Sequence, residues 1–157
     1  MNSMLTAPEW LLEEARRIGR ARYRENRSSG RCHTNFRGDP ATPALDAYGA
    51  FAELCFSEFS GLPIRVKTEC PDPRSDVDGW EVKSTVRPLG RLLVPLRDAN
   101  RYSVEDRIVL IFVDPPRFKI VGWQRAGFFV GVPDKLDETL PSPAYACSQK
   151  ELLEYPE

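Results

Sequence analysis

The stretch DVDGWEVK, residues 76–83, predicts a β-hairpin in the middle of this chain. Its Asp78-Gly79 pair lies between two runs with strand character, and Asp-Gly in that setting is the strongest short-range signal for a two-residue hairpin turn. Such a turn places Asp76 opposite Glu81. Directly opposed residues share one face of a sheet, with Cβ atoms roughly 4.5–5.5 Å apart. The register therefore predicts that these two carboxylates lie side by side.

Strand alternation adds a cation to this pair of carboxylates. Successive side chains of a strand point to opposite faces, so Lys83 shares the face of Glu81. Trp80, Val82 and Ser84 take the other face. The hairpin register thus gathers two acids and one base in one place.

Two carboxylates this close repel one another, and one takes up a proton unless a cation lies between them. A divalent metal resolves the repulsion. Hard oxygen ligands suit Mg²⁺ or Mn²⁺, which commonly use one or two carboxylates and complete their shell with water and substrate phosphate. The hypothesis is a metal site at Asp76 and Glu81, with Lys83 orienting the attacking water or stabilising charge on the phosphate. The alternative is a cross-strand ion pair in solvent, because Glu-x-Lys is common by chance.

Two helices are expected before the hairpin. Helical spacing of apolar residues predicts the first over about residues 8–25, and a loop rich in Gly, Ser and Pro follows over 26–44. The second helix begins at Asp46 as its N-cap and ends at Gly61. Its Glu53 lies beside the apolar stripe and is a candidate to hold a metal-bound water. His33, in the loop, is treated as a surface residue.

The rest of the chain is rich in expected strands. Residues 107–113, RIVLIFV, are almost continuously apolar, which suits a central strand buried on both faces. The other runs with strand character are residues 64–70, 76–86, 91–97, 118–123 and 144–148, and a short helix is expected over 149–155. This order predicts an α/β fold in one domain, with a central mixed sheet flanked by helices.

The chain has 157 residues, of which 41% are hydrophobic, and this suffices for one packed domain. It has no apolar run long enough to cross a bilayer and no secretion signal, so a cytoplasmic protein that does not insert in a membrane is expected. The cysteines are far apart without a C-x-x-C pair, which argues against structural zinc and against a disulfide framework. We expect reduced thiols at Cys32, Cys55, Cys70 and Cys147.

The net charge of −1 hides an uneven distribution. Arginine dominates the region from residue 16 to residue 31, whereas acidic residues prevail after residue 132. An arginine-rich helix face attracts phosphates through counterion release, and the alternative is an ordinary solvated face. The candidate nucleic-acid contacts are Arg16, Arg20, Arg24 and Arg27.

The chain resembles the PD-(D/E)XK nuclease superfamily, in which a helix with a glutamate precedes a hairpin carrying an Asp and then (Asp/Glu)-x-Lys. The matching residues are Glu53 in GAFAELCF, Asp76 in DVDG, and Glu81 with Lys83 in EVK. The segments GRARYREN, LDAYGAFAEL, DVDGWEVKST, FKIVGWQ and AYACSQKELL together look like small phage or mobile-element proteins of that superfamily. This likeness extends over most of the chain from about Arg16 onward.

The resemblance implies a restriction-endonuclease-like fold and Mg²⁺-dependent (or Mn²⁺-dependent) cleavage of a DNA phosphodiester. It also implies that Asp76 and Glu81 bind the metal, that Glu53 is an outer or water-mediated ligand, and that Lys83 lies at the nucleophile. Asp72, in the same register, is a second choice for the aspartate ligand. Membership alone does not establish activity, so an inactive module that binds DNA or a protein partner stays open. A homodimer is plausible, because two sites cut two strands more easily.

Overall fold

A computed structural model of the protein describes residues 3–28, 43–65 and 76–156. The helices are α1 (Glu9–Ser28), α2 (Pro43–Ser60) and the short α3 (Ala126–Phe129). Three 3₁₀ turns accompany them, namely η1 (Leu96–Arg101), η2 (Pro133–Lys135) and η3 (Gln149–Glu151). The strands are β1 (Leu5–Thr6), β2 (Trp80–Thr85), β3 (Leu92–Pro95), β4 (Arg107–Asp114), β5 (Arg117–Arg125), β6 (Leu136–Asp137) and β7 (Ala144–Cys147).

The protein is an α/β domain in which two helices pack on a mixed sheet of four strands. The order in this sheet is β1-β5-β4-β2. β2 runs parallel to β4, while β5 pairs antiparallel with both β4 and β1. A second, antiparallel sheet has the order β3-β7-β6. The predicted α/β class and the predicted mixed sheet are therefore confirmed, whereas the two long helices cover one face of that sheet and do not flank both.

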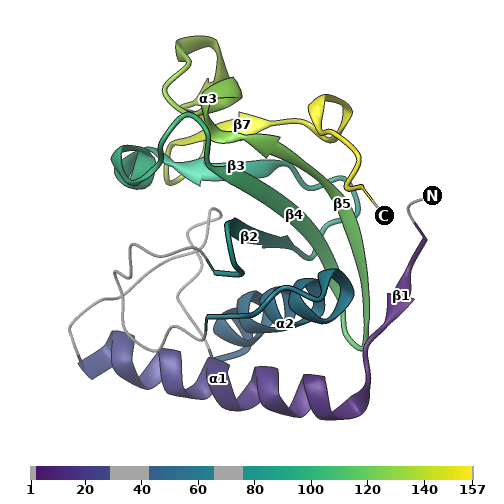
Figure 1. Ribbon diagram of the computed structural model, residues 1–157. Coiled ribbons are helices and arrows are strands. Elements are labelled where there is room, and N and C mark those ends of the chain that lie inside the picture. The colour runs from purple at the N-terminus through teal and green to yellow at the C-terminus, as the bar shows by residue number, and fades with distance from the viewer. Residues whose placement is uncertain (1–2, 29–42, 66–75, 157) are drawn as a thin grey trace.

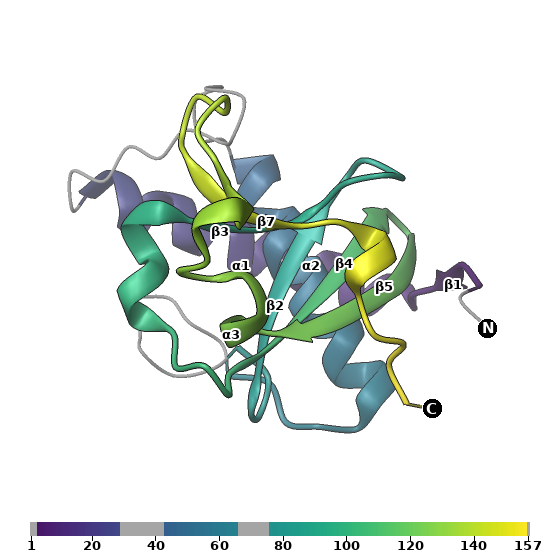
Figure 2. The ribbon, with the colours of Figure 1, turned by 90° about the horizontal axis from the view of Figure 1, so that it is seen from above.

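The elements form three layers, as Figure 1 shows. α1 and α2 cover one face of the four-stranded sheet, and β3 and β7 lie beyond its other face. Viewed from above, the small sheet lies in front of β2 and β4 with the two helices behind them (Figure 2). β4 supplies buried side chains to both sides, with Val109 and Ile111 in the helical core and Ile108 and Leu110 in the core beneath the small sheet. The expectation of a central strand buried on both faces is confirmed.

The predicted hairpin is present at the start of β2. Val77 and Trp80 exchange both backbone hydrogen bonds, with N–O distances of 3.1 and 2.6 Å, so they face one another across the turn. Gly79 has a φ of 75°, a conformation that costs glycine little because it lacks a Cβ. On its other side Val77 bridges to Ile64. Of the strand expected over residues 64–70, residues 66–70 lie outside the described residues.

The helices begin and end near their predicted positions. α1 runs three residues further than expected and α2 starts earlier, so both ends of the loop expected over 26–44 are helical, while 29–42 lie outside the described residues. Asp46 was wrongly expected as an N-cap, because it lies inside the first turn of α2. Gly61 ends α2 as predicted, with a φ of 70°.

The C-terminal prediction was wrong. The segment after β7 forms only a 3₁₀ turn, because Leu153 leaves helical geometry to exchange two backbone hydrogen bonds with Trp123 of β5. This pairing protects part of an edge that β1, a strand of two residues, covers only at Leu5 and Thr6. The edge contacts were not visible in the sequence, because neither segment has strand periodicity.

The structure also bears on two expectations drawn from the composition, which concern membrane-spanning helices and the cysteines. Within the three described ranges, no helix is both long and apolar enough to span a membrane. Cys55 and Cys147 are free, buried thiols, as expected. Burial raises the pKa of both thiols, that of Cys147 to about 11, so both are poor nucleophiles at neutral pH. Cys32, Cys70 and His33 lie outside the described residues.

Candidate active site at the free edge of β2

Asp76 lies at the open edge of the four-stranded sheet. β2 is the last strand of that sheet among the described residues, and Asp76 lies just before the turn that leads into it. The carboxylate is buried, and its Oδ2 accepts the backbone N–H of Val82 at 2.8 Å. A carboxylate in this position caps a strand edge and is held in one orientation by the backbone. The turn at Asp78-Gly79 is what places it there.

The next two charged residues of the hairpin form a compact group with a tyrosine. The Lys83 Nζ donates to Glu81 Oε1 at 3.0 Å, and the Tyr102 hydroxyl donates to the same oxygen at 3.1 Å. The Lys83 ammonium also lies 5.9 Å from the centre of the Tyr102 ring. Trp80 and Val82 point the other way, into the helical core. The predicted alternation along β2 is confirmed, with Glu81 and Lys83 together on one face.

The charge states in this group are well defined. Burial alone lowers the pKa of Lys83, but the charges of Glu81 and Asp76 and the interaction with Tyr102 outweigh burial and raise the pKa above its ordinary value. Lys83 is therefore a cation at neutral pH. Burial raises the pKa of Tyr102 to about 12, so its hydroxyl stays protonated and donates.

Glu53 is held on the helical side of the sheet. It is buried on α2, and each of its oxygens accepts from one nitrogen of Arg22 on α1, at 2.9 and 2.7 Å. Burial alone lowers the pKa of Arg22, but the hydrogen bonds and charge of Glu53, with the charges of Asp76 and Asp46, raise it. A bidentate pair of this kind fixes both side chains.

The charge of Asp76 acts on both ion pairs. It contributes to the raised pKa of Arg22 and to the raised pKa of Lys83. We call the following residues the carboxylate cluster: Asp46, Glu53, Asp76, Glu81, Arg22 and Lys83.

Glu53 does not join Asp76 and Glu81 in one group of ligands. Among the residues that the structure describes, no set of three or more His, Cys, Asp or Glu side chains is arranged so that it could hold a metal ion. The structure brings Glu81 and Lys83 together, and the joint metal site of Asp76 and Glu81 stays a prediction. The role of Glu53 as a ligand stays a prediction. Asp72, the second choice for the aspartate, lies outside the described residues.

No family model, curated protein or solved structure matches this chain. The assignment of a function consequently depends on the chemistry of the carboxylate cluster itself.

Two residues of the site were missed from the sequence. Tyr102 follows η1 and reaches Glu81 across 21 positions of sequence, so no local pattern announces it. Arg22 does carry a signal, because it continues the buried stripe of Leu11, Ala15 and Ile18 on α1. A charged side chain on a core stripe needs a buried partner. That requirement points to Glu53 or another acid on the facing helix.

The predicted arginine contacts are all on α1 and all exposed, namely Arg16, Arg20, Arg24 and Arg27. The first three recur every fourth residue and so share one face of the helix, at about 6 Å per step. None of these three makes an ion pair with any residue in the described ranges. Arg27 instead contacts Tyr23, donating to its hydroxyl at 3.1 Å.

Proposed function

We propose that this protein is a metal-dependent deoxyribonuclease with a PD-(D/E)XK site and a restriction-endonuclease-like fold. The observation that carries the proposal is the position of Asp76, Glu81 and Lys83 on the hairpin of β2, the last strand of the sheet among the described residues. Lys83 donates to Glu81 at 3.0 Å, and the charge of Asp76 contributes to the raised pKa of Lys83.

The donor set suits a hard divalent cation. Mg²⁺ commonly takes one or two carboxylates from a protein and fills its shell with water and phosphate oxygens. Asp76 and Glu81 would hold it, with Glu53 as an outer or water-mediated ligand. When bound, the ion lowers the pKa of a water and offsets charge on the phosphate.

The protein's own side chains have distinct tasks in this proposal. Lys83, kept protonated by its acidic neighbours, donates a hydrogen bond to the attacking water or to the phosphate oxygen on which charge develops. Tyr102 fixes the orientation of Glu81 through its hydroxyl. Arg22 fixes Glu53 and limits the repulsion between the acids on the helical side.

A cleavage assay tests the proposal. Supercoiled, linear, single-stranded and branched DNA are incubated with the protein and Mg²⁺ or Mn²⁺, with Glu81→Gln, Lys83→Met and Asp76→Asn in parallel. We expect metal-dependent cleavage that each substitution reduces by at least about 100-fold, as for loss of one electrostatic catalytic group. Glu58→Gln, on the exposed face of α2, is the matched control. Absence of cleavage on every substrate, or cleavage that survives all three substitutions, would refute the proposal.

An inactive module that binds DNA or a protein partner is the second candidate. It is favoured by the internal pairing of the acids, because Glu53 is occupied by Arg22, and Glu81 accepts from both Lys83 and Tyr102. Calorimetric titration with Mn²⁺ separates the candidates. A nuclease takes up the metal with an affinity that falls in Glu81→Gln, whereas the module gives no saturable heat. DNA binding that depends on salt but not on metal would then support the module.

A further inference from the structure

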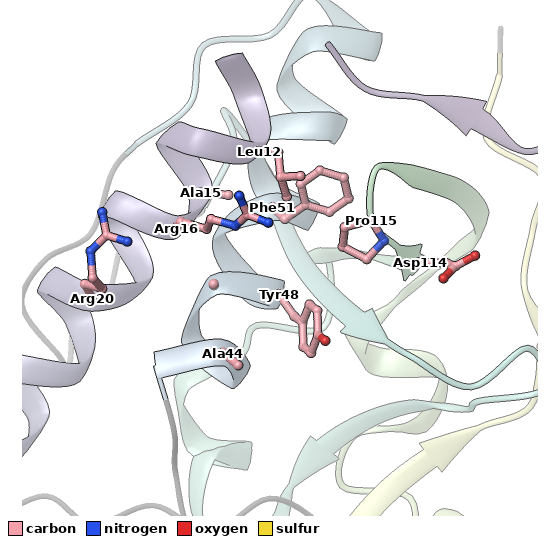
Figure 3. Close-up of a pocket in the computed structure, with 10 residues that line it drawn as sticks. Leu12, Ala15, Arg16, Arg20, Ala44, Tyr48, Phe51, Asp114 and Pro115 are labelled. Carbon is pink, nitrogen blue, oxygen red and sulfur yellow. The ribbon is translucent and has the colours of Figure 1, made fainter. Parts of the chain in front are cut away.

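A pocket of about 550 Å³ opens between α1, α2 and the β4–β5 turn, and its lining does not include Glu53, Asp76 or Glu81. Figure 3 shows its walls. The rings of Tyr48 and Phe51 from α2 and of Pro115 from the turn lie round one space, and Arg16 extends from α1 beside it. Arg20, one turn further along α1, also lines the pocket. The volume is in the range of sites that hold a small molecule or a single nucleotide.

The pocket lining combines apolar and aromatic side chains with two arginines. Leu12 and Pro115 offer apolar surface above the buried Phe51, and Tyr48 adds an aromatic ring that is only partly buried. Arg16 and Arg20 are exposed and make no ion pair with any residue of the described ranges. Asp114, the acid in the lining, is neutralised by its ion pair with Arg117. The matching ligand is an anion that carries a flat ring.

The arginines of α1 continue beyond the pocket and could contact the phosphates of neighbouring nucleotides. Arg24 continues the spacing of Arg16 and Arg20 along the same exposed face, at about 6 Å per step. Binding of single-stranded nucleic acid commonly combines a positive track for the backbone with aromatic side chains on which bases stack. A base within a duplex is stacked and paired, so it cannot enter a pocket of this kind.

We infer that this pocket binds one unpaired nucleotide of a DNA strand, with its base against Tyr48 and its phosphates on the Arg16–Arg20–Arg24 row. The inference rests on the proposed function for its choice of DNA, and it names the substrate class as DNA with a single-stranded segment. Arg20 and Arg22 are separated by about 200° around α1, so the pocket and the Arg22–Glu53 pair lie on opposite flanks of the helix. The bound nucleotide is thus an anchor at a distance from the cleaved bond.

Binding in EDTA tests the pocket without any contribution from cleavage. A fluorescein-labelled 12-mer, single-stranded or annealed as a blunt duplex, is titrated with wild-type protein over a series of salt concentrations. We expect the single strand to bind at least about tenfold more tightly than the duplex. Tyr48→Leu weakens binding of the single strand about 5- to 150-fold, as for one lost base stack, and leaves the salt slope unchanged. Tyr48→Phe, which keeps the ring, binds as wild type.

The arginines are tested by their salt dependence. Arg16→Gln with Arg20→Gln makes the slope of log K against log salt shallower by about 1.4, since each phosphate contact on a single strand contributes about 0.7. Arg17→Gln is the matched control, because Arg17 lies on the same helix and is paired with Glu14. The double variant keeps the test valid even where Tyr48→Leu fails to fold, as judged by circular dichroism.

Several outcomes would overturn the inference. They are equal binding of single strand and duplex, wild-type affinity in folded Tyr48→Leu, an unchanged slope in the arginine variant, or tighter binding of an RNA 12-mer than of DNA. A change in the oligomeric state of Tyr48→Leu without a change in DNA affinity would assign the pocket to a second copy of the chain. Failure of the proposed function is a separate result. A protein that binds single strands in EDTA but never cleaves DNA with Mg²⁺ would refute the nuclease proposal and leave this binding site supported.

Discussion

Glu81 is the residue on which the contacts of the hairpin face converge. One of its oxygens accepts from both Lys83 and Tyr102, so the carboxylate has little freedom to turn. The hairpin residues of this group were predictable, because a two-residue turn and strand alternation are local rules. Tyr102 was not predictable, because its position depends on how η1 packs beside β2. Sequence patterns thus identified the charged residues of the hairpin and missed Tyr102, which orients Glu81, and Arg22, which pairs with Glu53.

Replacement of Tyr102 by Phe isolates the orienting hydrogen bond. The ring and its contact with the Lys83 ammonium remain, while the donor to Glu81 is lost. We expect the Kd for Mn²⁺ to rise about 10- to 100-fold, the range found when an outer hydrogen bond to a metal ligand is removed. The measurement is calorimetric titration, with thermal unfolding of the metal-free protein as a check on folding. Wild-type affinity for Mn²⁺ in Tyr102→Phe would show that Glu81 needs no such support.

The two long helices contact each other through glycine. A Cβ added at Gly19 of α1 would lie 2.6 Å from the backbone of Ala47 on α2, so the helices approach closely at this point. Both helices were predictable from their apolar periodicity, with ends displaced by about a turn or less. Their contact was not, because periodicity shows which face is buried and not which residue of the partner it meets.

Gly19→Ala and Gly49→Ala are expected to change stability in opposite directions. At Gly19 the gain of about 1 kcal/mol in helix propensity is outweighed by overpacking, which costs about 1–3 kcal/mol when backbone must move. We expect a net loss in the free energy of unfolding. At Gly49 of α2 an added Cβ meets no atom of the described residues within 4 Å, so a gain of about 0.5–1 kcal/mol is expected. Urea unfolding of the two variants gives both signs, and stabilisation by Gly19→Ala would contradict the close approach of the helices.

The small sheet is connected to the C-terminal turn through Glu151. This carboxylate forms an ion pair with Lys135 and accepts from Ser148, which lowers its pKa from 4.5 to about 2. A lowered pKa stabilises the fold above pH 4.5, and this stabilisation is lost as the pH falls toward 2. We therefore expect Glu151→Gln to lose less of its thermal midpoint than wild type between pH 5 and pH 2. Plots of Tm against pH that run parallel for the two proteins over that interval would contradict the lowered pKa of Glu151.

At the scale of the whole molecule, β4 organises two hydrophobic cores, one beneath the helices and one beneath the small sheet. The continuous apolar run of this strand made the central position predictable, since only a strand covered on both faces needs it. The small sheet as a separate layer was not predictable, because β6 and β7 have two and four residues and β3 pairs with β7 from a distant part of the chain. The site therefore lies where β2, an edge strand, meets both layers.

Binding of a divalent ion at this edge should stabilise the entire domain. A ligand that binds only the folded state at 100 times its Kd adds about 2.7 kcal/mol to the free energy of unfolding. For a domain of this size that corresponds to a rise of about 5–10 °C in Tm. We expect this rise with Mn²⁺, its reversal by EDTA, and its absence in Glu81→Gln. The variant also tests specificity, because non-specific binding of Mn²⁺ to the surface acids, which Glu81→Gln leaves intact, would raise both Tm values equally. An equal rise in both Tm values would show that the metal does not bind at Asp76 and Glu81. The proximity of these two acids would then need another explanation.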